Sequence, residues 1–283
     1  MNLFDTNSAS FHLPILGAIN TEQLWQDIHL QPICMNFKLL CYYVARHDAW
    51  TGKLRRIELD RGLLVRPGTL LALDVLLEHL CVQARWGNPE IYVVADIGRK
   101  GIHSWCAVSV VRVVSNSKPI ILLGVELVKH FDVQEFAFVI GHETGHLPSY
   151  NNQWRDDISL NFLVQELYES NRIDELNEIQ SNVSWKDGFQ RIMLNARAIE
   201  SRCELLGFLV CGSIHKAGTT LLSATLKNRK NAQQIERSNY FSVHVPMLSA
   251  SPVLGSFSVN AGHPFVPYRI NALAKFVNDS ELE

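Results

Sequence analysis

One pentapeptide constrains this chain more than any other feature. Residues 142–146 read His-Glu-Thr-Gly-His, an H-E-x-x-H motif. On an α-helix, side chains four residues apart lie on one face, so His142 and His146 can bind one metal ion together, typically Zn²⁺. Glu143 is then close enough to accept a proton from a water molecule that the metal activates. The motif therefore predicts a zinc hydrolase site, usually that of a peptidase.

The residues around the motif favour a buried helix. The segment 133–141 is mostly apolar and contains no proline, which is typical of a helix packed in a core. Pro148 should end this helix just after His146. Two histidines and a glutamate buried on such a helix would be costly without a partner, and a metal ion would provide one. The alternative is a surface helix that carries two histidines by chance.

A catalytic zinc ion usually has three protein ligands, so a third ligand should lie on another element. The segment 186–212 has apolar residues near helical spacing and carries Glu200 and Glu204, which are four residues apart and share a face. One carboxylate could bind zinc while the other orients a ligating histidine through a hydrogen bond. A solvent-facing pair with Arg197 and Arg202 as ion-pair partners fits the spacing equally well.

Patterns elsewhere predict a small sheet. Strands are expected at 90–96, 102–114 and 120–123, after a helix over 69–85 that a Gly-Asn-Pro sequence ends. The turn residues at 115–119 predict an antiparallel hairpin between the second and third strands.

Several segments occur in the order found in a known family, over about residues 69–275. They are Pro89–Val94, Ser104–Ala107, Ile120–Gly124, Phe131–Glu135, Glu200–Gly207, Gly262–Pro264 and Arg269–Leu273. With the H-E-x-x-H motif, they resemble the HtpX-like and CaaX-prenyl-protease-like zinc metallopeptidases of the gluzincin type. The resemblance implies an α+β zincin-type domain, mainly helical around a small sheet whose edge strand binds the substrate.

The same resemblance implies roles for individual residues. Glu200 corresponds to the third zinc ligand, and Glu204, where the family has aspartate, to a group that orients a ligating histidine. His263 and Arg269 would support the developing charge or the local fold. The substrate-binding edge strand would span 103–110, with a serine where the family has asparagine, and would include Ser104, Trp105, Cys106 and Ala107.

The stretch 238–268 contains no Asp, Glu, Lys or Arg and holds four prolines. Such a long uncharged loop could cover a cleft as a lid. His263, near its end, could stabilise an oxyanion, bind zinc as a further ligand and hold the enzyme shut, or simply bond to backbone. Tyr240, His244 and Tyr268 are weaker candidates for the oxyanion role.

Composition limits the remaining possibilities. A net charge of −2 without a basic stripe gives no reason to expect nucleic acid as a partner. No apolar stretch approaches the ~20 residues of a transmembrane helix, and the first residues do not resemble a secretory signal. Six cysteines without a CxxC pair read as buried thiols of a cytoplasmic protein.

Residues 1–65 are interpreted as an N-terminal extension packed on a zinc metallopeptidase domain of residues 66–283. The sequence thus predicts a zinc-dependent endopeptidase acting on peptide or protein substrates, with one Zn²⁺ per chain and Glu143 as general base. Two alternatives remain open. The chain could be a catalytically degenerate, zinc-stabilised peptide-binding module, or an auto-inhibited protease whose zinc is capped by His263.

Overall fold

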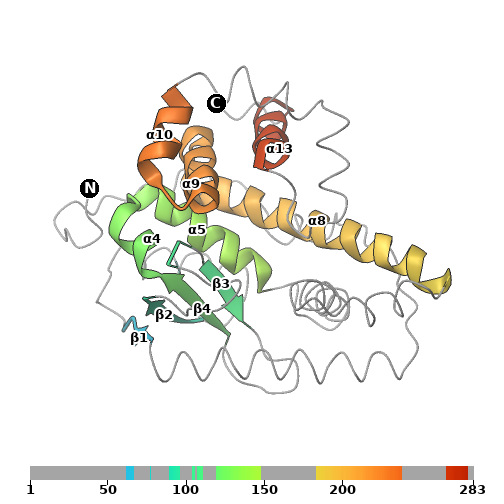
Figure 1. The fold of residues 1–283 in the computed structure, drawn as a ribbon, viewed down its shortest axis with the longest axis horizontal. Coiled ribbons are helices and arrows are strands. Elements are labelled where there is room, and N and C mark those ends of the chain that lie inside the picture. Colours follow the sequence, from blue (N-terminus) through green and yellow to red (C-terminus); the bar gives the residue numbers. More distant parts are fainter. Residues whose placement is uncertain are drawn as a thin grey trace.

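A computed structural model describes part of the chain: residues 62–66, 77, 89–95, 104–105, 107–110, 119–147, 183–237 and 266–279. Most of the expected N-terminal extension lies outside these residues, as do the helix expected at 69–85, apart from Leu77, and the loop 238–265 with His263. The described part is α+β, mostly helical with one small sheet (Figure 1).

The sheet is mixed and has four described strands in the order β1-β2-β4-β3. Their bounds are Leu63–Leu64 for β1, Glu90–Val94 for β2, Ala107–Val110 for β3 and Ile120–Gly124 for β4. β2 runs parallel to β4, whereas β1 pairs antiparallel with β2. β3 pairs antiparallel with β4, with Ala107 opposite Leu123, so the expected antiparallel pairing is confirmed. Among the described strands, β3 lies at one edge of the sheet.

Strand β4 is a continuous apolar run whose five residues are all buried. Such a run is typical of a strand covered on both faces. It leads directly into α4 (Val125–His130), which is followed by α5 (Val133–His146). The chain thus turns back from the sheet into the helix that carries the H-E-x-x-H motif, as the sequence predicts. Helix α5 ends at His146, two residues before Pro148.

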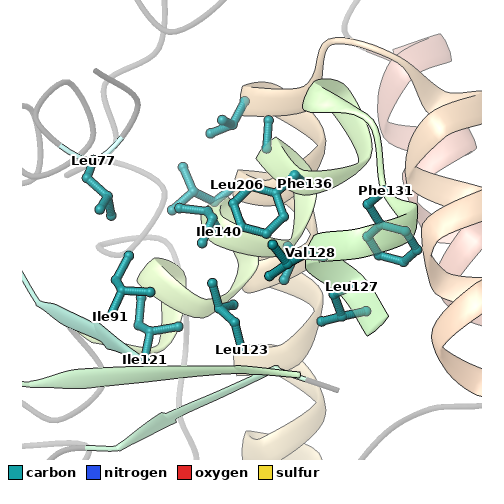
Figure 2. Packing of buried hydrophobic residues seen from close by; sticks show 13 residues of the cluster. Leu77, Ile91, Ile121, Leu123, Leu127, Val128, Phe131, Phe136, Ile140 and Leu206 are labelled. Atoms are coloured by element: carbon teal, nitrogen blue, oxygen red, sulfur yellow. The ribbon is translucent and has the colours of Figure 1, made fainter. Parts of the chain in front are cut away.

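Four further helices complete the described fold: α8 (Val183–Cys211), α9 (Ile214–Leu226), α10 (Arg229–Arg237) and α13 (Val266–Asp279). Helix α5 lies between two hydrophobic clusters. In the first, Phe136 and Ile140 of α5 pack with Leu206 of α8 and with Ile121 and Leu123 of the sheet (Figure 2).

The second cluster joins the other side of α5 to α8, α9 and α13, through residues such as Phe138, Leu209 and Ile270. Burying a large aliphatic or aromatic side chain contributes about 1.5–3 kcal/mol. These two clusters therefore hold α5 rigidly, and the end of this helix is a fixed platform for functional side chains.

The start of α5 is fixed by a capping box. The Asp132 carboxylate accepts hydrogen bonds from the backbone N–H groups of Gln134 and Glu135, while the Glu135 carboxylate accepts one from the Asp132 N–H. Two cations from other helices complete the cluster. Lys216 of α9 forms an ion pair with Asp132, and Arg229 of α10 lies 2.7 Å from the buried Glu135 carboxylate.

The surroundings shift the pKa values of Asp132 and Glu135 in opposite directions. Burial opposes ionisation of Asp132, but the hydrogen bond from the Glu135 N–H and the contact with Lys216 outweigh it, so its pKa is lowered. For Glu135, burial dominates over the nearby Arg229 and raises the pKa. Of the two carboxyl groups, Asp132 is therefore the one whose ionised form is stabilised by its surroundings at neutral pH.

We expect Asp132→Ala to destabilise the protein at pH 7 by about 1–2 kcal/mol, since a lost N-cap typically costs about 0.5–2 kcal/mol. Because the folded-state pKa of Asp132 is lowered, its contribution is complete above the unfolded pKa of about 3.9. The contribution is lost as the pH falls through the folded value. Urea unfolding at several pH values should show the difference from wild type shrinking at acidic pH.

The matched control is Asp132→Asn, because asparagine caps a helix nearly as well but cannot form the ion pair with Lys216. At pH 7, Asp132→Asn should lower the free energy of unfolding by less than Asp132→Ala does. A stability difference for Asp132→Ala that stays constant from neutral to acidic pH would contradict the assignment.

Candidate metal centre

The two motif histidines face one another at the C-terminal end of α5. Their Nε2 atoms are 3.2 Å apart, and their rings are nearly perpendicular, with centroids 4.9 Å apart. Both side chains are partly buried, and His142 also stacks against Phe138. The helical spacing of four residues produces this convergence, because one turn places both rings on the same face.

Glu200 of α8 provides the third group. Its carboxylate oxygens lie 3.5 Å from His142 Nε2 and 3.6 Å from His146 Nε2. Two histidines and one carboxylate are a common ligand set of catalytic zinc. In a tetrahedral site with metal–ligand bonds of about 2.0–2.1 Å, neighbouring ligand atoms are about 3.3–3.4 Å apart. The separation of the two histidine nitrogens and that of each nitrogen from its nearer Glu200 oxygen are close to this spacing, Oε2 facing His142 and Oε1 facing His146, so these residues could hold a metal ion.

Glu200 and Glu204 were interpreted either as a metal-binding pair or as a solvent-facing pair, and their exposed fractions decide between the two. Glu200 is 8% exposed and Glu204 is 2% exposed, so the solvent-facing pair is wrong. Glu204 forms an ion pair with Arg269 of α13, through Nε of the guanidinium. Arg269 thus contacts α8 one helical turn beyond Glu200, and its expected support of the developing charge or the local fold stays a prediction. The predicted orientation of a histidine by Glu204 remains a prediction.

Glu143 lies between the two histidines on α5 and is 6% exposed. A carboxylate next to two metal ligands is the usual general base of an H-E-x-x-H site. The neighbouring Thr144 is fully buried, and its hydroxyl donates to the backbone carbonyls of Ile140 and Gly141. Thr144 therefore turns inward as part of the helix packing.

Helices α5 and α8 touch through their backbones beside the metal site. A Cβ atom added at Gly141 would lie 2.9 Å from the Cα of Gly207, and one added at Gly145 would lie 2.9 Å from the Cα of Cys203. Side chains larger than hydrogen do not fit at these two positions. The sequence reasoning missed this contact, although its signal is visible as two small residues four apart on each helix.

Cys203 lies within this contact and has no exposed surface. Burial, together with the negative charges of Glu200, Glu143 and Glu204, raises the pKa of its thiol well above the ordinary value. Burial likewise raises the pKa of Cys211 to about 12. Neither thiol forms a disulfide, and the interpretation of Cys203 as a buried thiol is confirmed.

The segment before β3 is anchored to α4. The carbonyl of Ser104 accepts a hydrogen bond of 2.9 Å from the Glu126 N–H, in the first turn of α4. The indole of Trp105 stacks on His130, with ring centroids 5.3 Å apart and planes 3° apart. The indole also meets the ring of Phe131 edge-on, with ring centroids 6.2 Å apart. Trp105 thus packs against the core.

The structure describes only some of the other residues that were expected at the site. Ala107 is the first residue of β3 and pairs with Leu123. Cys106 and His263 lie outside the described residues, as do Tyr240 and His244. The substrate contacts expected of Ser104, Trp105, Cys106 and Ala107 therefore remain predictions, as does every role of His263.

We expect metal analysis of the purified protein to find zinc in the wild type and a clear loss of zinc in Glu200→Gln. An amide in place of the carboxylate removes the anionic ligand from the third position. The control is Glu126→Gln, which makes the same chemical change on α4, near the opposite end of α5. Zinc retained fully in Glu200→Gln would show that the third ligand lies elsewhere.

Comparison with protein-family models, with curated proteins and with solved structures found no match to this chain. In the part of the chain that the structure describes, no helix is both long enough and apolar enough to cross a membrane.

Proposed function

We propose that the protein is a zinc-dependent endopeptidase with a zincin-type active site. The observation that carries this proposal is the convergence of His142 and His146 from α5 with Glu200 from α8, at the spacing of a zinc ligand shell. A buried Glu143 beside them supplies the general base that such a site requires. A purely structural zinc site would not need that base.

Zinc bound there would act as a Lewis acid, polarising the scissile carbonyl group and acidifying the attacking water. The residues of the chain do the rest. Glu143 accepts the proton of the attacking water and passes it to the leaving amine. Burial of Glu143 and Glu200 keeps both carboxylates within a low-dielectric environment, where their interactions with charge are stronger.

Strand β3 supports a peptide rather than a small molecule as substrate. It lies at the edge of the described sheet and packs near α5. An extended peptide can add to such an edge through backbone hydrogen bonds, largely independent of its sequence. The proposed substrate is therefore an extended segment of a peptide or an unfolded protein.

The test uses an unfolded protein with fluorescent labels, such as labelled casein, and the purified zinc-loaded chain. We expect cleavage into fragments, loss of cleavage after removal of the metal by a chelator, and recovery when zinc is added back. Cleavage that persists without metal would contradict the proposal. A zinc-loaded chain that binds the labelled substrate without cutting it would favour the peptide-binding module instead.

A cytoplasmic location of the protein stays a prediction. In the described part, the free thiols of Cys203 and Cys211 support a reducing compartment such as the cytoplasm.

A further inference from the structure

We propose that Gly145 is a positioning residue, which sets the separation of α5 and α8 so that Glu200 reaches the metal bound by the two histidines. This inference rests on the metal site of the proposed function, and it is independent of the peptidase step. Gly145 occupies the fourth position of the H-E-x-x-H motif, next to His146. No ligand or base role is assigned to that position.

The geometry of the helix contact explains why glycine is needed. A Cβ atom at residue 145 would lie 2.9 Å from the Cα, 3.1 Å from the Sγ and 3.2 Å from the Cβ of Cys203. The closest of these atoms belongs to the backbone, so no change of side-chain rotamer can relieve the overlap. Cys203 is on α8 three residues after Glu200, nearly one helical turn away. A displacement of α8 at Cys203 therefore also displaces Glu200.

The expected displacement of α8 can be compared with the distances that a metal site allows. Carbon atoms in van der Waals contact are normally about 3.5–4.0 Å apart, so restoring ordinary contact with an alanine at residue 145, whose Cβ would lie 2.9 Å from the Cys203 Cα, would need α8 to move by roughly 0.6–1.1 Å. Metal–ligand distances tolerate only about ±0.2 Å. The carboxylate of Glu200, whose oxygens lie 3.5 and 3.6 Å from the histidine nitrogens, would be moved out of range.

A second close approach makes the helix separation hard to change elsewhere. One turn before Gly145, a Cβ at Gly141 would lie 2.9 Å from the Cα of Gly207 and 3.1 Å from the carbonyl oxygen of Leu206. Conversely, a Cβ at Gly207 would lie 2.7 Å from the carbonyl oxygen of Phe138. The two helices therefore approach closely over a full turn, and of the two contacts the one at Gly145 meets α8 nearer to Glu200, at Cys203 rather than Gly207.

The test measures zinc affinity directly, by competition with a chromophoric chelator, in the full chain. We expect Gly145→Ala to weaken zinc binding by about 10–100-fold, the range found when groups that orient metal ligands are changed. The matched control is Gly212→Ala. Gly212 follows α8, has φ of +68° and nothing within 4 Å of an added Cβ, so its substitution strains the backbone away from the interface between α5 and α8.

The control separates positioning from general loss of stability, because Gly212→Ala should destabilise the fold while keeping zinc affinity within about twofold of wild type. In the double variant Gly145→Ala with Cys203→Gly, the overlaps with the Sγ and Cβ atoms disappear, and we expect affinity to recover partly. If the single variant does not fold, the double variant carries the test, because the new methyl group would still lie 2.9 Å from the α8 backbone at residue 203.

Zinc affinity equal to wild type in a folded Gly145→Ala protein would overturn the inference, as would wild-type affinity in the double variant where the single variant does not fold. Equal losses of affinity in Gly145→Ala and Gly212→Ala would also overturn it, since stability alone would then explain the loss. A wild type that binds zinc tightly but cleaves no peptide would refute only the peptidase function. A wild type that does not bind zinc would refute both proposals.

Discussion

The zinc-loaded Glu143→Gln variant is expected to keep its metal and to lose peptide cleavage by at least about 10²–10⁴-fold, the usual contribution of a general base. Glutamine preserves the size of the side chain but cannot accept the proton of the attacking water. The residue is buried beside the two histidines of the candidate metal site, so no solvent-exposed base replaces it easily. Cleavage of labelled casein and zinc content, measured on the same sample, check this expectation.

The zinc content is the essential internal control, because loss of metal would abolish activity for a different reason. Glu126→Gln provides a second control, since it makes the same carboxylate-to-amide change on α4. Equal cleavage rates in wild type and Glu143→Gln would mean that the activity comes from another group or from a contaminating protease. Under either explanation, the proposed role of Glu143 as general base would lose its support.

Arg269→Met is expected to destabilise the protein by about 3–5 kcal/mol, the usual cost of breaking a buried ion pair by removing one partner. Glu204 is 2% exposed and its carboxylate pairs with Arg269, whose side chain is 13% exposed. Methionine fills much of the same volume but leaves the carboxylate without that counter-charge. The loss would appear in urea unfolding at pH 7 as a lower transition midpoint.

A double variant separates the charge effect from simple packing. Adding Glu204→Leu to Arg269→Met removes both charges, and replacing a buried pair by apolar residues is often close to neutral. We therefore expect the double variant to recover most of the lost stability. If the single and double variants were equally unstable, the contribution of Arg269 would be packing between α13 and α8, and the ion pair would be unimportant.

The helix that carries the motif was predictable from local sequence. The apolar segment 133–141 and Pro148 beyond it predicted α5 and its end, whereas the Asp132–Glu135 capping box that fixes its start was found in the structure. The strand bounds were less certain: within the expected strand 102–114, the described residues show β3 at Ala107–Val110 and a turn at 104–105, so the expected strand begins too early. Apolar runs specify that a strand exists more firmly than where it ends.

Spacing alone could not show which glutamate lies next to the two histidines. Glu200 and Glu204 share a face of α8, but spacing along a helix does not say whether that face points to solvent or to the core. The tertiary packing of α8 against α5 decides it. The pairing of Glu204 with Arg269 joins residues far apart in the sequence, and no local pattern predicts such a partner.

The buried thiol of Cys203 makes the packing of α5 against α8 directly observable. A thiol with no exposed surface and a strongly raised pKa cannot react with an alkylating reagent while α5 and α8 remain together. Each alkylation event at this residue therefore records a transient separation of the two helices. The alkylation rate, followed by mass spectrometry with and without zinc, would give the free energy by which the metal holds them closed.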